Sequence, residues 1–348
     1  MKTKRTGVGR AAIVIAFAVL LIGAGIGVYF TYGMHTPPDQ VSLLLEVKPT
    51  YNHFPYYYGL DHGIYGAQGI DLTIQPGVSD AQSISTLAAG KVQFALADLP
   101  TAIWEEETAN ISNVRAVAII YQKTFFSIYY NKADINSFAD LVGKTGGASN
   151  PSTSSQTKLF QLLLRLNNIS YSQVNMEYAA SSVTTPLFVK GDLQFVLRPL
   201  DSFGDIQSAA AKNGIQVGAF PFEAYGLSSY GSALFTTTQM IDKDPSLVQR
   251  MVTATMESLV AGAKDPAAAA ASLVKYEPQL NMTTAVTGIT LLNDCCMAGA
   301  NSTSDPLSYG WIDPLRMQTT LDLASQGLGV PSSVNLTSLY TDQFTKPP

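Results

Sequence analysis

The chain has 348 residues, of which 46% are hydrophobic and 14% charged. This composition supplies ample apolar material for a core, and the length exceeds that of one ordinary domain, so two lobes are expected. The net charge is −5, and no run of Lys or Arg follows the first ten residues. Because no basic patch is available to meet a phosphate backbone, the sequence predicts no nucleic-acid partner.

The N-terminus reads as a membrane anchor. Several basic residues, the last of them Arg10, precede an uninterrupted apolar stretch at 11–30. Such a stretch forms a helix of about 30 Å, enough to cross a bilayer core. We therefore expect residues 1–33 to hold a basic start and one transmembrane helix in the cell membrane, with the C-terminal part on the extracytoplasmic side. A cleavable signal peptide is the alternative, because it shares the basic start and apolar middle.

The cysteines and histidines predict neither a long-range disulfide nor a metal site. Cys295 and Cys296 are adjacent, and His35, His53 and His62 lie far from them in sequence. Two free thiols packed in a helix are expected. N-x-Ser/Thr triplets, which suit an exported surface, begin at Asn110, Asn168, Asn281, Asn301 and Asn335.

From residue 41 onward, short apolar runs alternate with helical patterns, which is typical of repeated β-α units and a parallel sheet. Strands are expected at 41–47, 71–75, 92–96, 114–121 and 125–130. The intervening helices are expected at 54–68, 79–89 and 101–108, the second of them capped by Ser79 or Asp80.

A second β-α series predicts strands at 144–148, 174–178, 195–197 and 215–220, with helices at 154–166, 184–189 and 202–212. A strand at 232–236 reads as a return to the first lobe, and the remainder is helical. The expected lobes are therefore 41–130 with 231–348, and 131–230. Two crossings leave a hinge cleft, where ligands collect at the carboxyl ends of parallel strands.

Four segments carry a family resemblance: FPYYYGLDHGIYGAQGIDLTIQPG, LAAGKVQFALAD, DLVGKTGGASNPSTSSQTKLFQLLL and KYEPQLN. In order and spacing, residues 41 to about 311 resemble the type II solute-binding proteins that include alkanesulfonate, taurine, nitrate and thiamine-pyrimidine binders. The resemblance implies a periplasmic-binding-protein type II fold with two parallel-sheet lobes, a hinge cleft and a helical C-terminal part. It also implies a monomeric solute-binding component of an ABC importer, which hands its ligand to a permease served by an ATPase subunit.

Candidate ligand contacts in the first lobe follow its predicted strands. Tyr51, His53 and Phe54 form an aromatic loop suited to stacking on a planar ring and offering it a hydrogen bond. The resemblance favours His53 in the same role. Asp98 and Thr101 follow the third strand and should face the cleft, although an ordinary loop turn explains them equally well.

In the second lobe, the Ser-rich loop before the helix at 154–166 suits an anion or a carbonyl oxygen. Arg198 follows a buried strand as either a ligand clamp or the partner of Asp201 or Asp205 in an ion pair. The second-lobe and hinge candidates are Ser149, Ser152, Thr153, Ser154, Arg198, Asp201, Tyr225, Ser228 and Tyr230.

The ligand class stays open between a thiamine-pyrimidine-like heterocycle, favoured by the aromatic loop, and a sulfonate- or nitrate-type anion, favoured by the Ser-rich loop and Arg198. Two rival functions are a thiamine-pyrimidine-synthase-like enzyme and a membrane-tethered sensing domain. The resemblance implies that such an enzyme has a Lys and a His after the third strand, where this chain has Ala97 and Thr101. Neither a G-x-S-x-G elbow nor a P-loop occurs, so we expect no catalysis and no cofactor.

Overall fold

The computed structural model describes residues 37–151, 154–297 and 303–347. Gln40–Pro348 forms one compact unit. The predicted membrane segment at 11–30 lies outside the described residues, as do Ser152 and Thr153. Within the described ranges, no helix combines the length and the apolar character that crossing a membrane requires.

The first sheet has the strand order β2-β1-β3-β10-β4. Its strands are β1 (Asp39–Leu44), β2 (Ile70–Gln75), β3 (Phe94–Asp98), β4 (Val114–Ile119) and β10 (Ser232–Thr237). β1 and β3 are parallel, as predicted, but β10 runs antiparallel to both β3 and β4. The expectation of a purely parallel sheet is wrong for β10, because Ser232 enters opposite Asp98, at the carboxyl end of β3, and the strand runs back from there.

The second sheet has the order β7-β6-β8-β5-β9. Its strands are β5 (Phe126–Asn131), β6 (Thr145–Ala148), β7 (Asn175–Tyr178), β8 (Phe195–Pro199) and β9 (Val217–Pro221). β6 is parallel to β7 and β8, whereas β5 is antiparallel to β8 and β9. A boundary at residue 130 would leave β5 with the first sheet, but its pairing is with the second, since Phe126 starts opposite Pro199 at the carboxyl end of β8.

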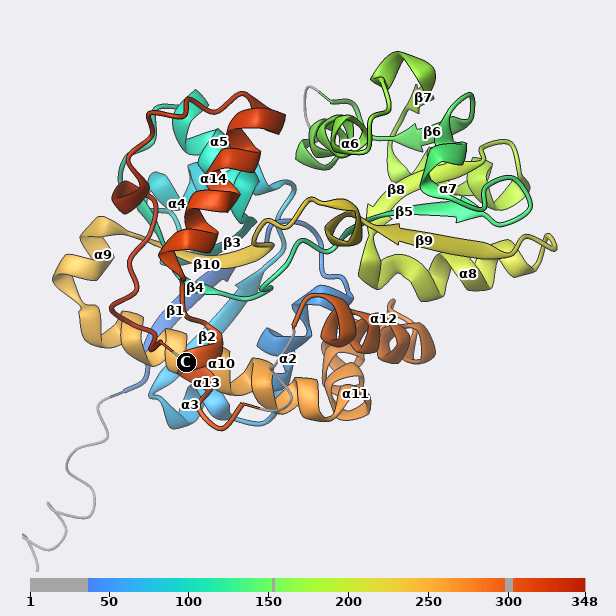
Figure 1. The fold of residues 1–348 in the computed structure, drawn as a ribbon. Coiled ribbons are helices and arrows are strands. Elements are labelled where there is room, and N and C mark those ends of the chain that lie inside the picture. Colours follow the sequence, from blue (N-terminus) through green and yellow to red (C-terminus); the bar gives the residue numbers. More distant parts are fainter. Residues whose placement is uncertain (1–36, 152–153, 298–302, 348) are drawn as a thin grey trace, which may run out of the picture. The chain divides into compact units, whose positions relative to one another are not determined.

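Helices cover both faces of the first sheet (Figure 1). On one face lie α4 (Asp80–Ala88), α5 (Leu99–Thr108) and α14 (Pro314–Leu328), and on the other α2 (Phe54–Asp61), α10 (Pro245–Lys264) and α11 (Pro266–Tyr276). α14 also packs against α6 (Ser155–Leu166), which covers one face of the second sheet. One apolar cluster therefore includes residues of both sheets.

The predicted helix at 54–68 is two helices, α2 and α3 (Ile64–Ala67). Gly63 separates them with φ +67°, a left-handed conformation that ends one helix and that a side chain would strain. The break follows from this single backbone angle, which helical periodicity does not reveal.

Helix α12 (Met282–Cys295) connects elements that belong to different sheets. It packs against α11 and the 3-10 turn η1 (Tyr51–His53), and also against α8 (Phe203–Ala211) and the turn η4 (Leu200–Ser202). Gly288 makes this approach possible, because a Cβ there would lie 2.6 Å from the Asp201 carbonyl oxygen. α12 thus holds η1 and η4 beside one another.

Candidate functional site

Glu46 and His53 form a buried pair just past the carboxyl end of β1. His53 Nε2 lies 3.1 Å from Glu46 Oε2, and Asn52 Nδ2 donates to Glu46 Oε1 at 3.0 Å. The backbone N–H of Thr50 donates to His53 Nδ1 at 3.0 Å. Since Nδ1 accepts, the ring proton sits on Nε2 and faces the Glu46 carboxylate. Burial alone would raise the pKa of Glu46, but contact with His53 and the amide of Asn52 outweighs it and lowers that pKa.

Asp98 ends β3 and caps α5. Thr101 Oγ1 donates to Asp98 Oδ2 at 2.8 Å, and the Asp98 backbone N–H donates to Asp80 Oδ1 at 2.7 Å. The ordinary turn explanation therefore accounts for Thr101 and for one oxygen of Asp98. The other oxygen, Asp98 Oδ1, is buried without a hydrogen-bond partner.

Asp201 brings the second sheet to this site. It lies in η4, directly after β8, and is 1% exposed. Its Oδ2 accepts the backbone N–H of Asn52 at 3.0 Å, and its Oδ1 has no hydrogen-bond partner. Tyr51 strengthens the same junction, because its hydroxyl donates to Asp205 Oδ2 on α8 at 2.9 Å and lies 2.7 Å from Thr284 Oγ1 on α12.

We call Glu46, Asp80, Asp98 and Asp201 the acidic cluster. Burial, reinforced by the charge of Asp80, raises the pKa of Asp98 to about 8. Burial, reinforced by Glu46, raises the pKa of Asp80 to about 7. Burial also raises the pKa of Asp201 to about 6, against a partial offset from its bond to Asn52. Three of the four groups therefore retain protons more strongly than ordinary carboxyls.

Uncharged buried groups with unused hydrogen-bonding capacity are also present. Tyr56 is 1% exposed, its hydroxyl has no hydrogen-bond partner, and the charge of Glu46 adds to burial in raising its pKa. The charge of Glu46, a member of the acidic cluster, therefore acts on the Tyr56 hydroxyl. Ser127 in β5 and Ser229, three residues before β10, carry buried hydroxyls that likewise lack partners. Unsatisfied buried polar atoms are uncommon and call for an explanation such as a ligand.

Arg198 is engaged within the second sheet and its covering helix α7 (Ser181–Lys190). Its guanidinium donates to Thr185 Oγ1 at 2.8 and 3.0 Å, to Thr184 Oγ1, and to the carbonyl oxygens of Ser181 and Leu197. Burial lowers its pKa to about 10. The structure gives it no ion pair with Asp201 or with Asp205 among the described residues. These contacts favour a structural role over either predicted role.

Three of the predicted aromatic contacts pack into the protein. Phe54 is 0% exposed and lies against Gly262 of α10. The ring of Tyr230 packs against Arg316, whose guanidinium carbon lies 4.3 Å from the ring centroid. The Tyr230 hydroxyl accepts the backbone N–H of Asp313. Tyr225 stacks on Phe138 of the 3-10 turn η2 (Phe138–Leu141), with ring centroids 4.4 Å apart.

The Ser-rich loop shows helix capping where it is described. Ser154 is the N-cap of α6 and accepts the backbone N–H of Thr157 at 3.3 Å, while the Ser149 carbonyl accepts from Thr157 Oγ1 at 2.8 Å. Ser152 and Thr153 lie outside the described residues. Ser228 is exposed. The structure thus joins His53, Asp98 and Asp201 into one neighbourhood, and gives Ser154 a helix-capping role.

The cysteines and the other acidic groups do not form a metal site. Cys295 and Cys296 are free, as expected, and Cys296 is buried with its sulfur 3.5 Å from the Thr124 carbonyl oxygen. No grouping of His, Cys, Asp and Glu in the described parts of the chain could hold a metal ion.

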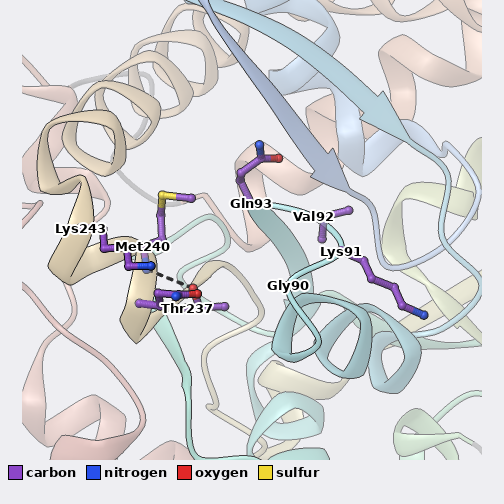
Figure 2. A pocket seen from close by; sticks show the side chains of 8 residues that line it. Gly90, Lys91, Val92, Gln93, Thr237, Met240 and Lys243 are labelled. Atoms are coloured by element: carbon purple, nitrogen blue, oxygen red, sulfur yellow. Dashed lines mark hydrogen bonds between the residues drawn. The ribbon is translucent and has the colours of Figure 1, made fainter.

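A separate open pocket of about 330 Å³ lies at the amino end of β3, away from the acidic cluster. Figure 2 shows it between the segment that leads into β3, with Lys91 and Gln93, and the helix α9 (Thr238–Lys243). Thr237 caps α9 by accepting the Met240 backbone N–H at 3.1 Å. Because Asp98 marks the opposite end of the same strand, this pocket does not share the side chains of the acidic cluster.

Sequence reasoning missed Glu46 and Asn52. Glu46 follows the buried run at 41–45, so the rule that pointed to Asp98 and Arg198, a polar residue at the carboxyl end of a strand, applies to it equally. Asp80 is a helix-cap residue in sequence, and its position beside Asp98 depends on how α4 meets β3. Asn52 carries no comparable signal, because its role depends on the turn η1.

Comparison with known protein families gives one match. Residues 50–269, more than half of the chain, match the family model described as NMT1/THI5 like. No curated protein sequence matches the chain.

Solved structures of similar fold include binding proteins. The aliphatic sulphonate binding protein SsuA from Escherichia coli is 13% identical, with a TM-score of 0.66 over 89% of this chain and 95% of that one. The nitrate-binding protein NrtA from Synechocystis PCC 6803 is 10% identical, with a TM-score of 0.61 over 88% and 87%. The Candida albicans CA3427 gene product, which has the generic periplasmic binding protein fold, is 11% identical, with a TM-score of 0.60 over 89% and 98%. At these identities the likeness establishes the periplasmic-binding-protein fold.

Proposed function

Because the chain belongs to the NMT1/THI5-like family, we propose that it is the extracytoplasmic solute-binding component of an ABC importer. In this proposal, a small organic molecule binds between the two sheets, each of which belongs to one lobe. Ligand docks beside His53 on the first lobe, and closure of the second lobe over it produces the form that a permease reads. The protein acts as a monomer, and the segment at 11–30 tethers it to the membrane.

The contact between Asn52 and Asp201 carries the proposal. It joins the turn after the first strand of one sheet to the turn after β8 of the other, at 3.0 Å. Ligands of open α/β sheets bind outside the carboxyl ends of strands, and here the carboxyl ends of β1, β3 and β8 all contribute buried polar groups. Two of those groups, Asp98 and Asp201, each retain an unpaired oxygen that a ligand could engage.

A catalytic role receives less support from the same geometry. The Thr50 hydroxyl lies 3.3 Å from His53 Nδ1, but Nδ1 already accepts the Thr50 backbone N–H. The Thr50 hydroxyl itself donates to Asn52 Oδ1. His53 is therefore not placed to remove a proton from that hydroxyl, as nucleophilic catalysis would require.

A thermal-shift screen of the full chain tests the proposal, with aminopyrimidines, amines, alkanesulfonates, taurine and nitrate as ligands. Ligand at ~100 times its Kd adds roughly 2.7 kcal/mol to the free energy of unfolding, which raises the melting temperature. We expect one class to do so, and the shift to be lost in His53→Gln. The matched control is His62→Gln, at the end of α2, where the exposed imidazole stacks on Tyr58. Absence of any shift across all classes would contradict a solute-binding function.

A further inference from the structure

The acidic cluster contains more carboxyl groups than its basic neighbours could neutralise if all of them were ionised. Within the described parts of the chain, the contact of the cluster with a basic side chain is that of Glu46 with His53. Other ionisable groups that interact with it electrostatically are acidic or phenolic: Asp205 on α8, Tyr56 on α2, Tyr121 after β4 and Tyr129 on β5. Arg198, on β8 of the second sheet, forms hydrogen bonds with α7 and makes none with the cluster among those that the structure shows.

Buried carboxylates without counter-charges are unstable, and they either keep their protons or receive a cation. The unpaired oxygens of Asp98 and Asp201, which are 2% and 1% exposed as residues, provide acceptors from the first and second sheets. The buried Tyr56 hydroxyl, also unpaired, adds a neutral hydrogen-bonding group on the α2 side. A ligand with several N–H donors and a positive charge would satisfy the carboxylate oxygens, whereas a sulfonate or nitrate would be repelled by them.

We propose that the ligand is an organic cation, such as a protonated amine, an amidine or a protonated amino-heterocycle, and that its binding expels protons from the acidic cluster. This inference rests on the proposed solute-binding function and specifies its ligand class. Proton and cation compete for the same oxygens, so binding is linked to pH. The raised pKa values of Asp98 and Asp80, about 8 and about 7, place that competition in the neutral range.

Three probes of one shape test the charge preference: benzamidinium, the neutral isostere benzamide, and benzenesulfonate. Spermidine and an alkanesulfonate extend the set to flexible ligands. Calorimetric titration of the full chain in two buffers that differ in protonation enthalpy gives the number of protons released. We expect at least one cation to bind, with net proton release at pH 7 and affinity rising about tenfold or more from pH 6 to pH 8.

Variants assign the effect to the cluster. Asp98→Asn preserves the cap of α5, because asparagine also caps helices, and removes the charge. It should weaken cation binding about tenfold or more and reduce proton release. The matched control is Glu106→Gln, which neutralises a carboxyl group that is 4% exposed on α5 and lies outside the cluster. If Asp98→Asn does not fold, proton release by the unmodified protein remains a sufficient test.

The outcomes separate the two proposals. Binding of alkanesulfonates or benzenesulfonate without any cation would overturn the cation inference and leave the solute-binding function standing. Cation binding without proton release, or with equal affinity in Asp98→Asn, would also overturn it. Failure of every ligand class in the thermal-shift screen would instead count against the solute-binding function.

Discussion

Two buried ionisable side chains, each near the carboxyl end of a strand in one of the two sheets, differ in how fully they are hydrogen-bonded. Arg198, near the carboxyl end of β8, has its guanidinium hydrogen-bonded to Thr184, Thr185 and two carbonyl groups. Asp98, at the end of β3, has one oxygen satisfied and the other left unpaired. A completed network stabilises the fold, whereas an incomplete one leaves bonding capacity for something else. The comparison teaches that burial and charge alone do not identify a ligand contact, and that unused hydrogen-bonding atoms discriminate better.

We expect the largest effect on stability from replacing Arg198, whose guanidinium is hydrogen-bonded within the protein. Arg198→Met should lower the free energy of unfolding by about 3 kcal/mol, because it leaves the Thr184 and Thr185 hydroxyls without their buried partner. Urea denaturation measures this loss. Ligand affinity of the fraction that stays folded should be unchanged. A stable Arg198→Met protein that no longer binds ligand would reverse the comparison and make Arg198 the clamp.

The second effect is on the pH dependence of stability, and here the substitution is expected to raise the free energy of unfolding. A pKa of about 8 for Asp98, against about 3.9 for an unfolded aspartate, means that the folded state holds more protons between pH 4 and pH 8. The free energy of unfolding of the ligand-free protein should therefore fall as pH rises through this window. Asp98→Asn should flatten that fall and stabilise the protein at pH 8 by about 2 kcal/mol. An unchanged slope in melting temperature against pH would show that Asp98 is not the group responsible.

We expect a smaller effect on stability from a change in helix α12, which packs against both η1 and η4. Gly288→Ala adds a methyl group 2.6 Å from the Asp201 carbonyl oxygen, so α12 or η4 must shift. We expect a loss of about 1.5 kcal/mol in the free energy of unfolding, together with weaker ligand binding because Asp201 is displaced. Gly329→Ala is a useful contrast. A Cβ there meets no neighbouring atom, so any loss of stability comes from the backbone φ of +79°, which a side chain strains. Equal ligand affinity in the two variants would argue against a role for Asp201.

The smallest effect is expected for Tyr51→Phe. It removes the hydroxyl that donates to Asp205 and contacts Thr284, but keeps the ring between η1 and α12. The free energy of unfolding should fall by about 0.5–1 kcal/mol. Denaturation detects this change, and the number of protons released on ligand binding should stay the same. A loss of proton release would mean that Tyr51 belongs to the acidic cluster.

The order of strands and helices was predictable because each element has its own local signal. Strands at 71–75 and 114–121 and helices at 79–89 and 154–166 correspond to β2, β4, α4 and α6 within a few residues. The direction of β10 was not predictable, since it depends on where a connection enters a sheet and not on side-chain periodicity.

The site was predictable in part. Asp98 ends β3, and His53 and Asp201 lie in the turns η1 and η4 at the expected edge, where the structure brings the three together. Phe54 and Tyr230 have the same aromatic character as a ligand contact, but packing against α10 and α14 uses them in the core. The saturation of Arg198 depends on the position of α7 thirteen residues earlier, which no local pattern encodes.

The place of β10 has a consequence for how the chain acquires its structure. β10 lies between β3 and β4, yet it follows the entire second sheet in sequence. During synthesis or export, β4 must wait for residues 232–237 before it can pair in the first sheet. Pairings between distant parts of a chain form slowly. A nascent chain that ends before β10 should therefore expose the edges of β3 and β4 and depend on chaperones, and the two sheets mature together.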